Sequence, residues 1–71
     1  MDERKARHML AEYNESINNH RDNLRNMKLR LYTCKESEKE WYLENIEKVK
    51  AKIEKEEREK EDFINKYSSI I

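Results

Sequence analysis

Three residues of the types that bind zinc or act as nucleophiles, His8, His20 and Cys34, are spread along the first half of the chain. Zinc prefers imidazole nitrogen and thiolate sulfur, and a site needs several such ligands around one ion. Along a helix, their separations of twelve and fourteen residues correspond to about 18 Å and about 21 Å, so the three side chains cannot converge. The sequence therefore predicts no metal site, and no cofactor is expected.

The four serines, Ser16, Ser37, Ser68 and Ser69, occur in no context that activates a hydroxyl group. None belongs to a nucleophile elbow, a phosphate-binding loop or a triad-like arrangement. An enzyme also needs a concave pocket that excludes water, which two helices cannot enclose. We therefore expect that the protein is not an enzyme.

The basic residues Arg21, Arg25 and Lys28 share one helix face at i, i+4 and i+7, a spacing that suits contacts with phosphates. Asp22 interrupts this stripe, and the formal net charge of the chain is zero. A nucleic-acid-binding domain is normally clearly basic. A dimeric nucleic-acid-associated protein is therefore kept as an alternative, ranked below a protein that binds another protein.

The overall composition favours long helices with solvated surfaces. Charged residues make up 45% of the chain and hydrophobic residues 35%, while glycine and proline are both absent. Tight turns with positive φ are disfavoured without glycine, whereas Glu, Lys and Arg have good helix propensity. A chain of 71 residues buries little apolar surface, so we expect it to need a partner or a second copy.

Hydrophobic residues recur in a heptad rhythm in each half of the chain. In the first half, steps of four and three residues connect Ala6, Leu10, Tyr13, Ile17, His20, Leu24, Met27 and Leu31. In the second half, the same steps connect nine positions, seven of them apolar: Tyr42, Ile46, Val49, Ile53, Glu56, Lys60, Phe63, Tyr67 and Ile70. Each set forms a seam on one helix face, a pattern that packs against another helix at a shallow angle.

The two seams are out of phase, which indicates a break in the helix between them. Two capping boxes lie in this gap, Thr33 with Glu36 and Ser37 with Glu40. Acidic residues that follow Ser37 suit the first turn of a helix, where negative charge is stabilised. We therefore predict that Ser37 caps the second helix.

These signals predict an all-α fold, an antiparallel two-helix hairpin with a coiled-coil-like seam, in a single domain. The first helix is expected at about 2–33, the turn at about 34–37 and the second helix at about 38–68. The alternative is one continuous helix of about 100 Å that pairs in a parallel coiled-coil dimer.

Reversal near Glu36 places opposite one another those residues whose numbers total about 73. Ile17 then faces Glu56 and Tyr13 faces Lys60, which makes a polar layer within the seam. Polar layers of this kind cost stability and can fix the register of helix pairing.

The second seam is widened on one side by Leu43, Ile64 and Ile71, as expected for a helix with more than one neighbour. We expect two hairpins to use this width by forming a homodimeric four-helix bundle.

Three large apolar residues, Leu29, Tyr32 and Trp41, fall off the seams near the predicted turn. Exposed side chains of this kind are costly unless another molecule covers them, and Trp and Tyr are frequent anchors of interfaces. In the competing interpretation, the turn folds tightly and buries them locally. If exposed, they predict a surface for a larger protein.

The sequence thus predicts a small interaction module, a regulator, inhibitor or assembly factor of a larger protein, with a structural coiled-coil spacer as a further alternative. One cysteine and no leader-like apolar run favour a cytoplasmic setting, and no run approaches the ~18 apolar residues that span a membrane. Small chains rich in Asn, Lys, Glu and Ile are common in phages and mobile elements, so such an origin is expected by analogy.

Overall fold

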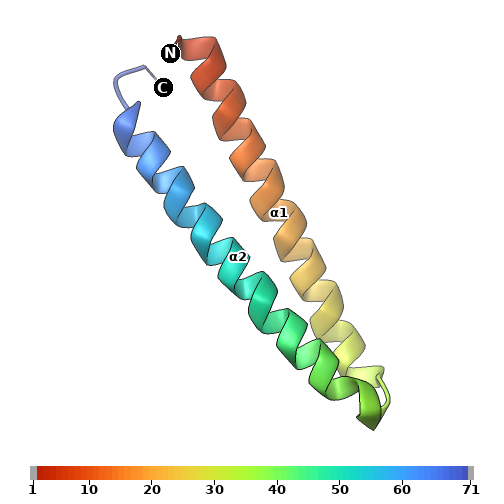
Figure 1. Ribbon diagram of the computed structural model, residues 1–71. Helices are drawn as coiled ribbons and strands as arrows, with labels where there is room; N and C mark the ends of the chain where they lie inside the picture. The colour runs from red at the N-terminus through yellow and green to blue at the C-terminus, as the bar shows by residue number, and fades with distance from the viewer. Residues whose placement is uncertain (1, 71) are drawn as a thin grey trace.

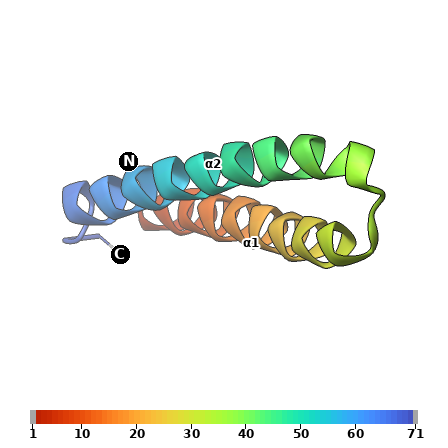
Figure 2. The same ribbon diagram turned by 90° about the horizontal axis from the view of Figure 1, so that it is seen from below.

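The computed structural model describes residues 2–70 and consists of two antiparallel helices joined by a short turn (Figure 1). Helix α1 spans Glu3–Thr33, the short 3₁₀ helix η1 spans Glu36–Glu38, and helix α2 spans Lys39–Lys66. The molecule measures 51 × 15 × 12 Å, and the helices lie side by side along its whole length (Figure 2). The predicted hairpin is confirmed, and the alternative of one continuous helix is wrong.

Helix α1 begins where the side chain of Asp2 supplies an acceptor that the backbone lacks. Asp2 is extended (φ −85°, ψ 167°), and its Oδ1 accepts a hydrogen bond of 2.8 Å from the Lys5 N–H. This satisfies one of the amides that the first turn of any helix leaves without an intrahelical partner. The carboxylate also lies at the positive end of the helix dipole, which adds to its stabilising effect.

The turn reverses the chain without glycine. Helix α1 ends where Cys34 becomes extended (φ −73°, ψ 162°), and Lys35 is extended as well (φ −70°, ψ 152°). The thiol of Cys34 lies 3.4 Å from the Leu31 carbonyl and donates to it, so one of the last carbonyls of α1 is partly satisfied. Two extended residues redirect the chain here, and no residue from 2 to 70 has a positive φ.

The prediction that Ser37 caps the second helix is wrong. Ser37 lies inside η1, and the residue that precedes α2 is Glu38, whose side chain makes no capping hydrogen bond. The amide of Glu38 donates to the Lys35 carbonyl (2.9 Å), and the amide of Lys39 donates to the Glu36 carbonyl. Because the 3₁₀ turn already satisfies these amides with backbone carbonyls, α2 begins without a serine cap.

The contact between the helices follows both seams and is thin. Among residues 2–70, six apolar side chains are buried: Ala6, Ile17, Met27, Ile46, Val49 and Phe63. The other seam residues are half-buried: Leu10, Tyr13, His20, Leu24, Leu31, Tyr42, Ile53, Glu56, Lys60, Tyr67 and Ile70. No large side chain in the described part of the chain is completely buried, so much of the seam still touches water.

Apolar packing is concentrated toward the two ends of the seam. Near the turn, Met27 of α1 packs with Ile46 and Val49 of α2. Toward the open end, the ring centroid of Phe63 lies 5.9 Å from that of Tyr13 and 4.9 Å from that of Tyr67. Each cluster brings residues from both helices together, so the hairpin is held at both ends.

The register of the hairpin is close to the predicted one. Contacts between the helices join residues whose numbers total 72 for Ser16 with Glu56, 73 for Met27 with Ile46 and 76 for Tyr13 with Phe63. The predicted total of about 73 lies within this range.

Two residues predicted to widen the second seam, Leu43 and Ile64, are 53% and 36% exposed on α2. Ile71, the third, lies outside the described residues.

Candidate functional site

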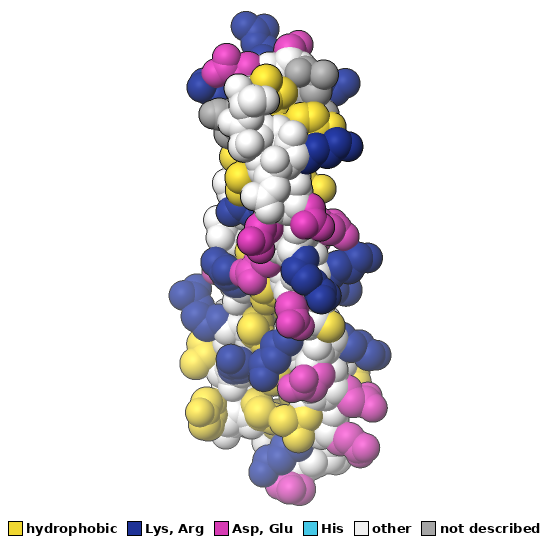
Figure 3. Space-filling view, turned by 90° about the vertical axis from the view of Figure 1, so that its left-hand side faces the viewer, with side chains coloured by type: hydrophobic (Ala, Val, Ile, Leu, Met, Phe, Trp, Pro, Cys, Tyr) yellow, Lys and Arg dark blue, Asp and Glu magenta, His cyan; other side chains and the backbone are white. Residues whose placement is uncertain are grey.

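All three residues predicted to bind a partner are exposed near the turn. Leu29 is 60% exposed, Tyr32 is 88% exposed and Trp41 is 59% exposed. The interpretation in which the turn buries them is therefore wrong, because α1 and α2 meet only along their seams and these residues lie off them. On the side of the molecule drawn in Figure 3, hydrophobic side chains appear among charged ones toward the turn end.

The two broad faces of the hairpin separate Trp41 from Tyr32. Trp41 borders an open groove whose α1 side includes Asn23 and Arg30, and this groove contains neither Leu29 nor Tyr32. Tyr32 lies on the opposite face, and Leu29 points away from α2, as their positions on the helix require. The structure thus places the three residues around the turn end instead of in one patch.

The groove beside Trp41, here called the Trp41 groove, combines an aromatic wall with positive charge. The Trp41 ring packs edge-on against Tyr42, with centroids 5.0 Å apart and ring planes at 89°. Arg30, Lys48 and Lys52 also line this groove, and no carboxylate is among its described lining residues. Such a surface suits a ligand that brings apolar and acidic groups together.

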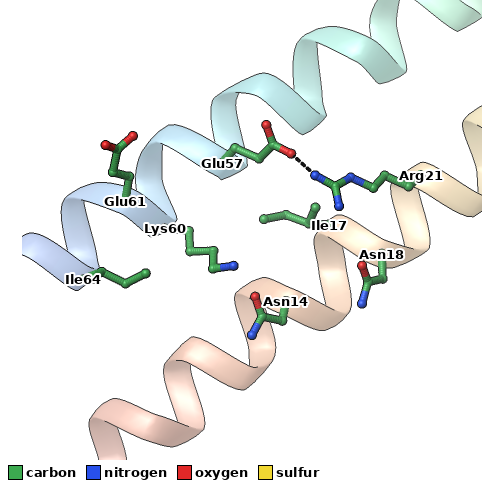
Figure 4. Close-up of a pocket in the computed structure, with 8 residues that line it drawn as sticks. All are labelled: Asn14, Ile17, Asn18, Arg21, Glu57, Lys60, Glu61 and Ile64. Carbon is green, nitrogen blue, oxygen red and sulfur yellow. Dashed lines mark hydrogen bonds and ion pairs between the residues drawn. The ribbon is translucent and has the colours of Figure 1, made fainter. Parts of the chain in front are cut away.

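The opposite face, here called the groove face, contains a second groove of about 510 Å³ midway along the hairpin (Figure 4). It is lined by four residues of each helix: Asn14, Ile17, Asn18 and Arg21 of α1, and Glu57, Lys60, Glu61 and Ile64 of α2. An ion pair between Arg21 and Glu57 crosses it, and the Lys60 amine extends toward α1. This groove is open and mixed in charge, so it presents a contact surface and not an enclosed site.

A polar layer interrupts the seam between the two apolar clusters. Both carboxylate oxygens of Glu56 accept from the Ser16 hydroxyl, at 3.0 and 2.9 Å, and Oε1 lies 3.2 Å from His20 Nε2. The sequence predicts that Glu56 lies opposite Ile17 in a polar layer, and the two residues that Glu56 contacts, Ser16 and His20, flank Ile17 along α1. Glu56 thus has two polar partners, so the layer has its hydrogen bonds satisfied.

The basic stripe of the nucleic-acid alternative is largely engaged with carboxylates of the same chain. Arg21 pairs with Glu57 of α2, and Arg25 lies 3.8 Å from Asp22. Both pairs are exposed, so phosphates can compete for the guanidinium groups only by displacing a neighbouring carboxylate. The stripe is therefore a weak basis for nucleic-acid binding.

No protein-family model, no curated protein and no solved structure matches this chain. Over residues 2–70, neither helix combines the length and the apolar character needed to cross a membrane. The same residues contain no group of three His, Cys, Asp or Glu side chains arranged to hold a metal ion. The surfaces described above are thus the basis for a functional proposal.

Sequence reasoning missed the cations that accompany Trp41. Lys48 and Lys52 follow Trp41 at i+7 and i+11, positions that lie above one another on a helix. This spacing is the signal in the sequence that places the two lysines beside Trp41. The contribution of Arg30 from α1 depends on the pairing of the two helices, which spacing within one helix does not reveal.

Proposed function

We propose that this protein is an interaction module that binds a larger protein through the turn end of the hairpin, as a regulator, inhibitor or assembly factor. The observation that carries the proposal is a large aromatic residue, Trp41, left 59% exposed beside a basic groove. Tryptophan and arginine are the residues most often found at the energetic centre of protein interfaces. Exposing such a side chain is costly unless a partner covers it.

The charge of the Trp41 groove defines the chemistry of that partner. Arg30, Lys48 and Lys52 are best matched by carboxylates that flank an apolar centre. Leu29 and Tyr32 lie around the same end of the hairpin, so a concave partner surface that receives the turn end touches them as well. The partner is therefore a protein with an acidic, apolar cavity or groove of its own.

The setting of the interaction is proposed to be the cytoplasm. Cys34 is a free thiol, which suits a reducing compartment, where disulfide bonds are rare.

The proposal is tested by capturing partners from native lysate on the immobilised protein and measuring the affinity of the purified partner for variants. Trp41→Ala is expected to weaken binding about thirtyfold, as for a hot-spot residue that contributes about 2 kcal/mol. Lys48→Glu is expected to weaken it too, whereas Trp41→Phe retains most of the affinity. Arg58→Glu is the matched control for the charge change, because Arg58 is exposed on the outer side of α2.

Three results contradict the proposal. A partner that binds Trp41→Ala and Lys48→Glu with unchanged affinity shows that the Trp41 groove is not the site. Retention that nuclease treatment abolishes points to the nucleic-acid alternative. Self-association with no captured protein points to a structural spacer. Circular dichroism of each variant shows whether the helices are intact, which is expected because Trp41 lies off the seam.

A further inference from the structure

Apolar residues remain uncovered toward both ends of the groove face. Starting from Ile64 in the groove of Figure 4, steps of seven residues along α2 lead through Glu57 and Lys50 to Leu43, so all four share this face. On α1, two such steps lead from Asn18 to Tyr32. Tyr32 and Leu43 near the turn, and Ile64 toward the open end, are all exposed here.

The charges on the groove face are divided between the two helices. On α1 the face carries five cations, Arg4, Arg7, Arg21, Arg25 and Lys28. On α2 it carries five carboxylates and one cation, Glu40, Glu47, Glu54, Glu57, Glu61 and Lys50. The α1 side therefore has a charge of about +5 and the α2 side about −4, which makes the two halves of the face complementary to each other.

We infer that the groove face binds the groove face of a second copy, with a two-fold axis parallel to the long axis of the hairpin. In that arrangement, α1 of each copy lies on α2 of the other, and both turns lie at the same end. The basic α1 of each copy then lies against the acidic α2 of the other copy, so the dimer contains two such contacts. The opposite arrangement, with the axis across the hairpin, stacks α1 on α1 and α2 on α2, and it brings like charges together.

The two-fold axis also fixes which residues meet. Rotation about the long axis keeps every residue at its own height, so residues whose numbers total about 75 meet between copies as they do within one chain. Tyr32 then meets Leu43 of the partner copy at the turn end. Lys28 meets Glu47 of that copy in the same register. The same arrangement thus pairs exposed apolar residues with each other and exposed charges with opposite charges.

The size of the face is sufficient for a stable dimer. With extents of 51 × 15 Å, its footprint is roughly 750 Å², close to the ~800 Å² that each partner buries in a typical specific interface. Such an area is reached only if both helices of each copy take part. The Trp41 groove lies on the opposite face and stays open in the dimer, so binding of the proposed partner at Trp41 is tested separately from this inference, whereas Tyr32 lies in the dimer interface.

The test uses spin labels on the full chain. In a Cys34→Ser background, a nitroxide is attached to Lys35→Cys at the turn, and distances between copies are measured by pulsed electron paramagnetic resonance. Labels within about 30 Å are expected, because stacked helices lie about 8–10 Å apart. A distance near the full 51 Å length overturns the inference, because the turns then lie at opposite ends. A monomer at high protein concentration overturns it as well.

Charge reversal tests the register without relying on a label. Lys28→Glu and Glu47→Lys are each expected to weaken the dimer about fivefold, since two exposed pairs per dimer are lost. The variant that carries both reversals is expected to recover the wild-type dissociation constant within about twofold. Arg58→Glu, on the outer side of α2, is the control with the same charge change. Equal effects of Lys28→Glu and Arg58→Glu, or no recovery in the double variant, overturn the inference.

Discussion

The polar layer at Glu56 offers the most direct test of what sets the pairing of the two helices. Replacing Glu56 with alanine removes the acceptor for the Ser16 hydroxyl and the His20 imidazole at once. The side chains of His20 and Glu56 are only 27% and 24% exposed. A hydrogen bond to a charged group contributes about 1.5–3 kcal/mol, and partial exposure lowers the expected loss in unfolding free energy to about 1–2 kcal/mol.

The measurement is a double-mutant cycle with Ser16→Ala, Glu56→Ala and the variant that carries both. Urea unfolding followed by helical circular dichroism gives each free energy, at one low protein concentration so that association does not contribute. Glu54→Ala is the matched control, because Glu54 is exposed two residues away and undergoes the same change in helix propensity. We expect a coupling energy of about 1 kcal/mol between Ser16 and Glu56.

The reasoning is refuted if the two substitutions are additive within about 0.3 kcal/mol. It also fails if Glu56→Ala costs no more than Glu54→Ala. Glu56→Leu supplies the complementary result: an apolar residue in a seam position that is mostly buried is expected to raise stability by about 1 kcal/mol. A rise of that kind shows that the polar residue at position 56 costs stability relative to an apolar one.

Three further outcomes are expected. Phe63→Ala removes a buried ring that contacts Tyr13 and Tyr67, and it should lower the unfolding free energy by about 3 kcal/mol, seen as loss of a cooperative thermal transition in circular dichroism. Asp2→Ala should cost about 1 kcal/mol locally, measured as faster hydrogen exchange of the Lys5 amide, with the core amides unchanged. Trp41, the only tryptophan, should be quenched freely by acrylamide in the isolated protein and protected when the partner binds.

Much of the fold follows from spacing in the sequence, because a two-helix hairpin has one repeating interaction. Steps of four and three residues identify the inner face of each helix, and positions such as Ile17 and Val49 are buried there. The break in phase between the seams indicates the reversal. These signals are local and periodic, so they can be recognised in one sequence.

Where two local structures of similar stability compete, the spacing of residues does not show which one forms. Ser37 and Glu40 match the capping-box pattern, yet a 3₁₀ turn forms over the same residues and satisfies the amides of Glu38 and Lys39 with backbone carbonyls. The sequence contains no signal that ranks the two. The sequence likewise does not show which polar side chains of α1 meet Glu56, and in the structure these are Ser16 and His20. Contacts across the seam therefore needed the structure, although the seam itself did not.

The exposed residues illustrate a similar division. The spacing shows that Leu29, Tyr32 and Trp41 lie off the seams, and all three are exposed in the structure. Their distribution over different faces follows from how two antiparallel helices sit against each other. Arg30 joins Trp41 for the same reason, because it belongs to the other helix and approaches only after the chain reverses.

The glycine-free turn has a consequence for how the protein loses its structure. Between Glu3 and Lys66, only Cys34 and Lys35 lie outside a helical turn, and both can adopt helical dihedral angles. Rotation about two ψ angles is thus enough to convert the folded chain into a rod of about 100 Å. The chain can therefore lose its compact shape and keep its helices. Trifluoroethanol, which weakens apolar packing while favouring helices, is expected to open the hairpin and preserve its helix content.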